Sequence, residues 1–249
     1  MSEGEKIYGE RVSLGVTDPN AMTYMIGLAF IFFVHKIIQR YSLKKGIDKI
    51  HLVFLLFVVY EIISLASRGG QISILSSLTV YMILYPKKII KKKVFLILTA
   101  ILVLLTVGTI VNQLTSERWK ETIVEGNMSG REKIWPAAIE MIKRKPLLGY
   151  GIEENLYILG AYTGKERRDP HSSFFWILTE VGLLGGLPYI IGFLYCGYLA
   201  FLNRKKENGF VIFSIFVLCL VSNNSFSAIF LKLTWLILAM ATSLSLRKD

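Results

Sequence analysis

A histidine and a serine at the start of an apolar run have the types and spacing that most suggest catalysis in this sequence. His171 and Ser172 stand just before the run that begins at Phe174, and Gly182 and Gly185 interrupt that run. An imidazole titrates near neutral pH, so it can take a proton from a hydroxyl nucleophile. The alternative is a histidine that only marks the start of a helix at a membrane surface.

Two arginines next to glycines are the candidate ligands for an anion. Arg68 precedes two glycines, and Arg131 follows Gly130. A guanidinium group is a planar fork of donors that suits phosphate and pyrophosphate. The alternatives are a side chain that extends from a helix end to the membrane surface for Arg68 and a solvated side chain on a helix face for Arg131. Glu61 lies two helical turns before Arg68, and we expect these two to form an ion pair.

Metal and cofactor chemistry have no motif in the sequence. It contains no Asp-x-Asp pair, no cluster of cysteines and histidines, and no glycine string of the phosphate-loop type. Cys196 and Cys219 lie inside apolar runs, where cysteine behaves as a small hydrophobe. We therefore expect no metal ion and no cofactor.

The composition is typical of a polytopic membrane protein. Hydrophobic residues make up 53% of the 249 residues, and the mean hydropathy is +0.50. They come in blocks, whereas a soluble domain disperses them. The net charge of +11 would suit nucleic acid, but the basic residues stand at the ends of apolar blocks, where membrane topology places them. We expect no binding to nucleic acid.

The apolar blocks predict an all-α membrane protein with about seven transmembrane helices. The run 174–202 is too long for one straight span, so we expect a short first helix, a kink at 182–186 and then the span. Residues 210–246 are predicted to form a hairpin of two spans that is broken at 222–225. The other four predicted spans are 21–38, 50–66, 71–85 and 94–111.

The basic residues predict the orientation. Short loops on one side hold fourteen Lys and Arg residues, and those on the other hold only Arg68 and Lys232. Positive charge marks the cytoplasmic side, so the N-terminus and the long loop between the fourth and fifth spans are predicted to be external and the C-terminus cytoplasmic. His171 is then the one external histidine, because His35 and His51 fall at the cytoplasmic boundary, where we expect them to be solvated or interfacial. The predicted parts are an external segment 1–20, a four-helix part 21–111, an external loop 112–170 and a three-helix part 171–249.

The external loop is predicted to contain one amphipathic helix. Ser129 and Glu132 form the pattern of a capping box, and apolar residues recur at helical spacing after it. Pro136 would remove a backbone hydrogen bond from inside this helix, so either a kink lies there or the helix begins near Trp135. The glycines of 149–151 then supply a turn.

Together these pieces resemble the signatures of the O-antigen ligase and polysaccharide polymerase family. The residues from His171 to Gly185 fit the pattern H-[NSQ]-x9-G-x-x-G. The loop residues 130–135 and 146–151 resemble the pattern G-R…W…P-x-x-G-x-G. Arg68 follows a serine, as in a Ser-Arg of the family, and the segment from Arg11 to Asn20 is similar to an external loop that follows several earlier spans in family members.

The resemblance implies a site and a reaction. Family members move a glycan from an undecaprenyl-pyrophosphate carrier to an acceptor on the outer face of the bacterial cell membrane. By this resemblance His171 is the catalytic base. Arg68, Arg131 and Arg11 bind the pyrophosphate, whose departure needs stabilising charge rather than a proton. The supporting residues are Trp135, Gly149, Gly151, Ser172, Gly182 and Gly185.

The expected function is that of a glycosyltransferase of the bacterial inner membrane, a polysaccharide (capsule) polymerase that joins undecaprenyl-pyrophosphate-linked repeat units without a metal. The alternatives are a ligase that transfers finished glycan to a surface acceptor and a non-catalytic export or binding subunit for lipid-linked glycan. The expected partners are the lipid-linked glycan, the bilayer, and export and chain-length-control proteins. Because the segment with Arg11 follows earlier spans in the family, we expect that N-terminal spans of the full fold are missing, which would impair an enzyme.

Overall fold

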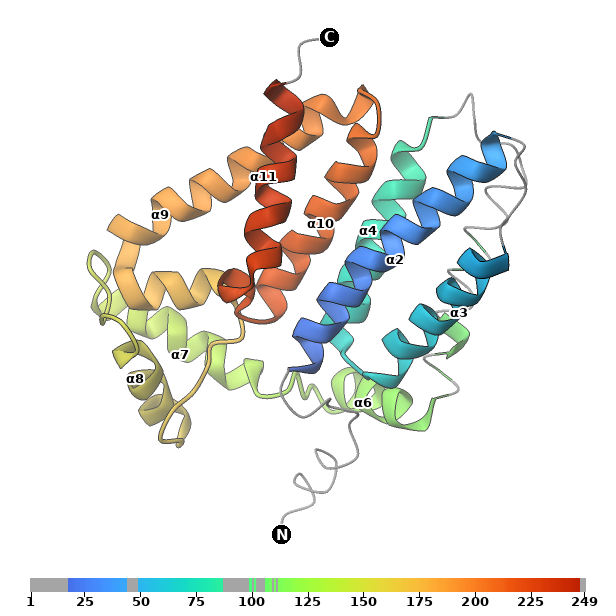
Figure 1. Ribbon diagram of the computed structural model, residues 1–249. Helices are drawn as coiled ribbons and strands as arrows, with labels where there is room; N and C mark the ends of the chain where they lie inside the picture. Colours follow the sequence, from blue (N-terminus) through green and yellow to red (C-terminus); the bar gives the residue numbers. More distant parts are fainter. Residues whose placement is uncertain are drawn as a thin grey trace. The chain divides into compact units, whose positions relative to one another are not determined.

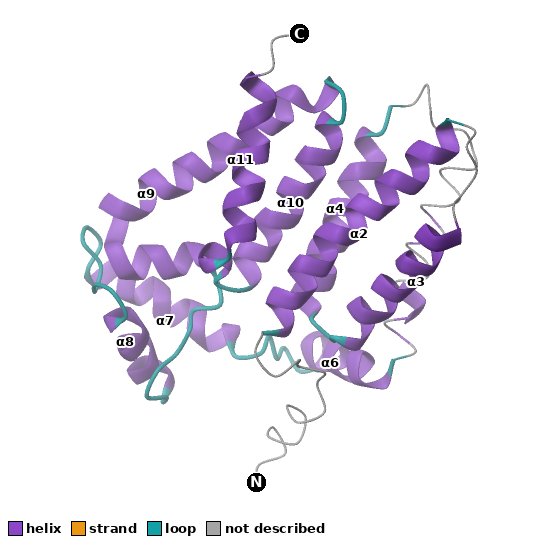
Figure 2. Cartoon of the chain, in the orientation of Figure 1, coloured by secondary structure: helices purple, strands orange, loops and turns teal. Residues whose placement is uncertain are grey.

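The computed structural model describes residues 18–43, 49–86, 99, 101, 106–108, 110 and 112–246. These residues form helices joined by loops, with no strand among them (Figure 2), so the all-α prediction is confirmed. The chain divides into two compact units, Met1–Trp119 and Lys120–Asp249, and the helices of each are labelled in Figure 1. Arg11 and most of the predicted span 94–111 lie outside the described residues.

Two helices in the described part of the chain are long and apolar enough to cross a membrane. They are Pro19–Arg40 and Ser173–Lys205, and both contain predicted spans. Two further apolar helices are shorter, Gly209–Ser225 and Lys232–Ser243. The count of seven spans and the placing of the loops remain predictions.

In the first unit, α2 packs against both α3 and α4. His35 on α2 lies 3.0 Å, through its Nδ1, from the Tyr81 hydroxyl on α4, and only 9% of His35 is exposed. The alternative that His35 is solvated is therefore wrong, because the packing of two helices covers it, while its place at the membrane boundary stays a prediction. The bounds are α2 Pro19–Ser42, α3 Lys49–Ser64, α4 Arg68–Leu84 and α6 Gln113–Val124, the last of which runs into the second unit.

In the second unit, α9, α10 and α11 pack against one another, while α7 and α8 pack against each other and against α9 (Figure 1). Ile134, Ala138 and Met141 of α7 and Leu159 of α8 form a buried core beside α9. α8 had no counterpart in the predictions. The bounds are α7 Arg131–Arg144, α8 Glu154–Thr163, α9 Ser173–Leu202, η1 Asn203–Lys205, α10 Gly209–Ser225, η2 Ala228–Phe230 and α11 Lys232–Leu246.

Two predicted details of this unit are corrected. The N-cap of α7 is Gly130, at φ 86° and without a side-chain cap, so the capping box at Ser129 is wrong. Glu132 instead accepts a hydrogen bond from Met128 N at 3.1 Å. α7 starts at Arg131, four residues before Trp135, so the alternative that this helix begins near Trp135 is wrong. The break in the C-terminal hairpin is also displaced, since α10 continues to Ser225 and the link to α11 follows it.

The predicted kink in α9 is confirmed at Gly182. Its φ of 62° and ψ of −162° are not helical, and they lie in a region that residues with a Cβ hardly enter. The two limbs of α9 therefore run in different directions (Figure 1). The kink was predicted within residues 182–186, and the structure places it at the first of these residues, Gly182.

The loop 146–151 closes the kink by hydrogen bonds between backbones. In a continuous helix the N–H groups of Leu183 and Leu184 would bond to the carbonyls of Thr179 and Glu180. Here those carbonyls accept from Tyr150 N at 2.9 Å and Gly151 N at 2.8 Å, and those N–H groups donate to Pro146 O at 2.7 Å and Leu147 O at 3.1 Å. The loop thus supplies the four partners that the bent helix lacks. We call this arrangement, residues 146–151 with residues 179–184, the kink lock.

Two glycines make the kink lock sterically feasible. A Cβ on Gly182 would lie 2.4 Å from Leu147 O and 2.6 Å from Gly149 N, and one on Gly149 would lie 2.6 Å from Glu180 O. Both residues have positive φ. These contacts are with backbone atoms, which cannot rotate away as a side chain does. The two segments can therefore approach this closely only where both positions are glycine.

Candidate active site

His171 lies directly before α9, and its backbone is in the left-handed region at φ 51°. Its N–H donates to Asp169 Oδ1 at 2.5 Å, and its Nδ1 lies 3.7 Å from the same oxygen. The His171 side chain is 31% exposed, so solvent or a substrate can reach the ring. A non-glycine residue at positive φ is uncommon and is often found at functional sites.

Arg131, the first residue of α7, is held by two backbone carbonyls. Its Nη1 donates to Met128 O at 3.1 Å, and its Nη2 donates to Ser225 O at the end of α10. Two bonds from different nitrogens fix the plane of the guanidinium group. The Arg131 side chain is therefore held in one orientation by bonds that connect the start of α7 to the end of α10. It is not a solvated side chain on a helix face.

The link between α10 and α11 connects Arg131 with the segment around His171. Ser225 O accepts from Arg131, the Ser227 hydroxyl donates to Asp169 Oδ1 at 2.8 Å, and Ile229 N donates to Ser173 Oγ at 3.1 Å. Residues 225–229, which we call the site link, thus bond to Arg131 and to residues on both sides of His171. Two of the predicted site residues are in this way brought to the same short segment.

Trp135 and Ser172, two of the predicted supporting residues, contact the segments on either side of His171. Trp135 Nε1 donates to Pro170 O at 3.2 Å, directly before His171, and its ring lies 5.8 Å from that of Phe175. Ser172 is the N-cap of α9 and is 1% exposed. Its hydroxyl accepts from Phe175 N at 3.5 Å, so it orders the first turn of α9 and does not face a substrate.

The four predicted supporting glycines belong to the kink lock or flank it. Gly149 and Gly182 are its contact pair, and Gly151 has φ 95° and donates to Glu180 O. A Cβ on Gly185 would meet only the side chain of Val181, one turn earlier on α9. These glycines shape the backbone around the site and offer no group for chemistry.

Arg168 and Asp169 are site residues that the sequence reasoning missed. Arg168 Nη2 lies 2.6 Å from the position that a Cβ on Gly130 would occupy, so its guanidinium group packs directly beside the start of α7. Asp169 bonds to both His171 and Ser227. An aspartate two residues before the candidate base was a signal available in the sequence, whereas the serines of the site link stand out in no pattern.

Arg68 lies in the first unit, at the first position of α4, and its Nη1 donates to Arg118 O at 2.5 Å. Ser67 caps α4 by accepting from Gly70 N at 3.1 Å, and it donates to Asn20 Oδ1 at 2.7 Å. The described contacts of Glu61 and Arg68 include no ion pair between them, so that prediction is wrong. The Ser-Arg and Asp-Pro-Asn pieces of the resemblance are therefore neighbours in the first unit.

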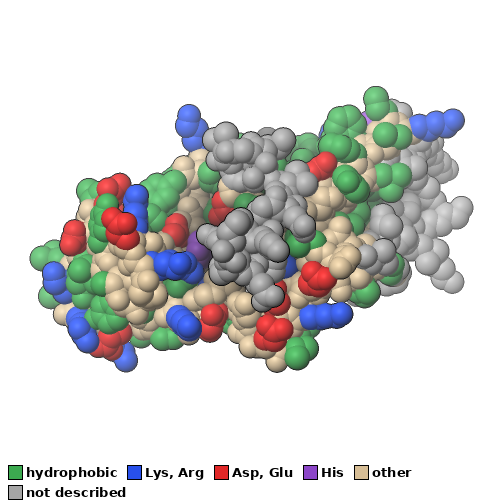
Figure 3. Space-filling view, turned by 90° about the horizontal axis from the view of Figure 1, so that it is seen from below, with side chains coloured by type: hydrophobic (Ala, Val, Ile, Leu, Met, Phe, Trp, Pro, Cys, Tyr) green, Lys and Arg blue, Asp and Glu red, His purple; other side chains and the backbone are tan. Residues whose placement is uncertain are grey.

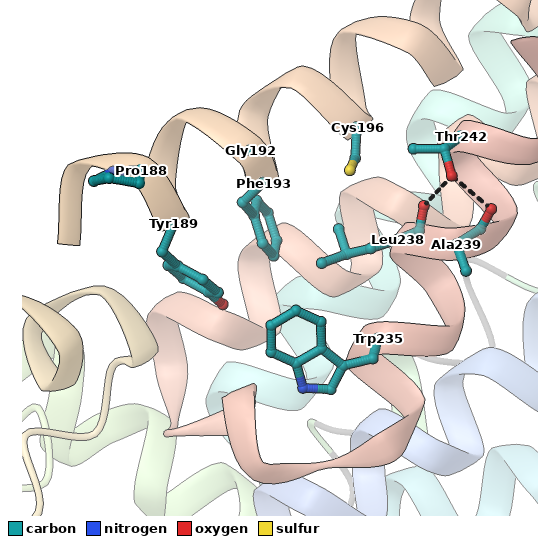
Figure 4. Close-up of a pocket in the computed structure, with 9 residues that line it drawn as sticks. All are labelled: Pro188, Tyr189, Gly192, Phe193, Cys196, Trp235, Leu238, Ala239 and Thr242. Atoms are coloured by element: carbon teal, nitrogen blue, oxygen red, sulfur yellow. Dashed lines mark hydrogen bonds between the residues drawn. The ribbon is translucent and has the colours of Figure 1, made fainter. Parts of the chain in front are cut away.

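An apolar groove of about 530 Å³ lies between the second limb of α9 and α11 (Figure 4). The rings of Tyr189 and Phe193 come from α9, and Trp235 comes from α11. Both α9 rings contact Phe174, three residues after His171, at 6.3 and 5.4 Å between centroids. The groove is thus connected to the first turn of α9 through packed aromatic rings.

The left half of Figure 3 shows charged side chains of both signs among hydrophobic ones, and α7 and α8 expose Ile139 and Tyr157. Arg144 pairs with Glu140 at 3.1 Å and Arg167 with Glu153 at 3.6 Å. Burial raises the pKa of the Tyr150 hydroxyl, and Lys145 Nζ lies 4.6 Å from the centre of its ring. Within the described ranges, no group of three His, Cys, Asp or Glu side chains is arranged to hold a metal ion.

A family model described as O-antigen ligase matches residues 50–190, which is more than half of the chain. A search of curated proteins finds no match. The matched range includes Arg68, Arg131, His171 and the whole kink lock, while the site link follows it.

Proposed function

The chain belongs to the O-antigen ligase family, and from this premise we propose that it is a membrane glycosyltransferase that joins undecaprenyl-pyrophosphate-linked repeat units into a polysaccharide. The observation that carries the proposal is the site link. Ser225 O holds Arg131, a candidate anion ligand, and Ser227 bonds to Asp169, which accepts a hydrogen bond from His171 N, the backbone of the candidate base. A lipid-pyrophosphate glycosyl donor calls for such a pair, one group for its charge and one for the proton of its acceptor.

The reaction assigns a part to each side chain. His171 takes the proton from a hydroxyl group of the acceptor sugar, and the oxygen attacks the anomeric carbon of the donor. The bond from that carbon to the pyrophosphate oxygen breaks, and the lipid pyrophosphate leaves with the electron pair. Arg131 stabilises the charge that develops on the leaving group. Arg168 adds positive charge nearby, while Arg68 and Arg11 keep the roles that the resemblance implies.

The second unit also contains an apolar groove that suits the lipid part of the substrate. The groove of Figure 4 is lined mainly by apolar and aromatic side chains, and α9, which forms one of its walls, also exposes Leu187, Ile191 and Leu194. Its volume is within the range of small-molecule sites, about 300–1,000 Å³, so it would take only the isoprene units nearest the pyrophosphate. The contact through Phe174 connects it to the turn that follows His171.

Reconstitution separates the proposed function from its alternatives. The chain in liposomes, supplied with a lipid-pyrophosphate-linked repeat unit, should yield a ladder of longer lipid-linked glycans. A single transfer to an added lipid acceptor, without a ladder, would favour the ligase. Binding of the lipid-linked glycan without any new glycosidic bond would favour the export or binding subunit and reject the glycosyltransferase.

Arg131→Lys should reduce the rate of glycan transfer by roughly 10–100-fold, because lysine keeps the charge but cannot bond to Met128 O, Ser225 O and a phosphate oxygen in one plane. The measurement is the initial rate per amount of folded protein in liposomes. Arg144→Lys is the matched control, since Arg144 is at the other end of α7 and 61% exposed. Equal rates in the two variants would return Arg131 to a structural role.

A further inference from the structure

The Asp169 carboxylate is at the centre of the contacts around His171. Its Oδ1 accepts hydrogen bonds from His171 N at 2.5 Å and from the Ser227 hydroxyl at 2.8 Å, and the same oxygen lies 3.7 Å from His171 Nδ1. The Asp169 side chain is 40% exposed and the His171 side chain is 31% exposed. One oxygen atom thus contacts the backbone of the candidate base, its ring and the site link.

The backbone of His171 has an unfavourable conformation that the Asp169 carboxylate stabilises. A φ of 51° is unfavourable for a residue with a Cβ, and such a conformation persists only where neighbouring groups fix it. The bond from His171 N to Asp169 does so from one side. The bond from Ile229 N to Ser173 Oγ fixes the site link to the residue two positions further on.

We propose that Asp169 is a positioning residue for His171, and that Ser227 holds Asp169 in place. This rests on the proposed function, because it adds a part to the same reaction. The carboxylate faces Nδ1, so it selects the tautomer with a proton on Nδ1 and leaves the Nε2 lone pair for the acceptor hydroxyl. Once Nε2 has taken that proton, the negative charge stabilises the imidazolium. Ring and carboxylate would close from 3.7 Å to hydrogen-bond distance when the acceptor binds, as catalytic hydrogen bonds often do.

The other charged groups near the ring do not replace this role. An arginine cannot accept a proton from Nδ1, and a lysine opposes an imidazolium by its charge. An acidic group on α9 itself is bonded elsewhere, since Trp176 Nε1 donates to Glu180 Oε2 at 3.1 Å. On α7, Glu132 accepts from Met128 N at 3.1 Å and Glu140 pairs with Arg144. The charged residues on the elements around His171 are Lys165, Glu166, Arg167, Arg168 and Asp169 on its own segment, Arg131, Glu132, Lys133, Glu140, Lys143 and Arg144 on α7, Glu180 on α9 and Lys232 at the start of α11.

Asp169→Asn separates positioning through charge from a merely structural role. The amide oxygen of asparagine can still accept from His171 N and from Ser227, so the loop keeps its bonds, but the negative charge is lost. We expect transfer to slow by roughly 10–100-fold. The acid limb of the pH–rate profile should move to lower pH by about half a unit to one unit, because an imidazolium without its carboxylate gives up its proton more readily.

A second readout does not depend on activity. The ring of His171 can be followed by NMR in histidine-labelled protein, with its signal assigned from His171→Asn, and in Asp169→Asn it should titrate at lower pH than in the wild type. Glu166→Gln is the matched control, an exposed carboxylate on the preceding loop, and should alter neither rate nor titration. Ser227→Ala should show a smaller loss of rate, since it frees the carboxylate without removing it.

The outcomes keep the two proposals apart. Wild-type rate together with an unmoved His171 titration in Asp169→Asn would overturn the positioning role, whatever the wild type does with glycan. An absence of transfer by the wild type, combined with a moved titration, would reject the proposed function and leave the coupling of Asp169 to His171 standing.

Discussion

Replacing His171 by alanine should leave the protein inserted in the membrane and able to bind lipid-linked glycan, while turnover falls by roughly 10²–10⁴-fold. The reason is that an acceptor hydroxyl attacks slowly when nothing takes its proton. The measurement is the chain-length distribution of the glycan, taken together with the amount of folded protein in the membrane. Long polymer made by stable His171→Ala protein would end the assignment of His171 as the base.

A second variant separates the chemistry of His171 from its backbone. At φ 51° the residue is in the left-handed region, which asparagine enters more easily than alanine. His171→Asn should therefore keep the loop in place and lose turnover as fully as His171→Ala. A histidine that only anchors the loop predicts the opposite, with lower protein yield in His171→Ala and normal specific activity in His171→Asn.

The second large effect is expected at the kink lock. Gly182→Ala should destabilise the protein by roughly 3 kcal/mol, because alanine is strained at φ 62° and ψ −162° and its Cβ would lie 2.4 Å from Leu147 O. For a chain of this size this corresponds to a loss of about 6–12 °C in melting temperature. The temperature at which half of the detergent-solubilised protein has lost its fold measures the effect.

Gly192→Ala is the control for that experiment. Gly192 is also on α9, and a Cβ there meets nothing within 4 Å. Alanine is the better helix former, so this variant should be as stable as the wild type or up to about 1 kcal/mol more stable. If Gly182→Ala melted together with Gly192→Ala, the kink lock would contribute nothing to stability.

The elements with a strong local signal could be predicted from the sequence. The run 174–202 is too long for one span and contains glycines, and the structure bends it at Gly182. Apolar residues at helical spacing after Glu132 predicted a helix, and α7 occupies that stretch, Arg131–Arg144. The start of α7 was predicted wrongly, because Ser129 and Glu132 imitate a capping box while Gly130 provides the turn.

The contacts that assemble the candidate site could not be predicted in the same way. Ser227 and Asp169 are 58 residues apart, and neither belongs to a pattern that indicates a partner. Arg131 bonds to the carbonyl oxygen of Ser225, an atom that every residue type possesses. The ion pair expected between Glu61 and Arg68 is also absent from the described contacts of these two residues, and Arg68 Nη1 donates to a backbone carbonyl, Arg118 O, which no side-chain pattern indicates.

The kink lock has a consequence for how this part of the chain tolerates change. Its four hydrogen bonds join backbone to backbone, so the side chains of Leu147, Leu148 and Tyr150 take no part in them. Substitutions at these three positions should therefore be absorbed wherever packing permits. Adding or deleting one residue between Pro146 and Gly151 would instead misalign donors and acceptors at once. The segment 146–151 is thus constrained by its length and its glycines. A related protein could have other amino acids at most of its positions and still form the same bend, provided that the segment has the same number of residues.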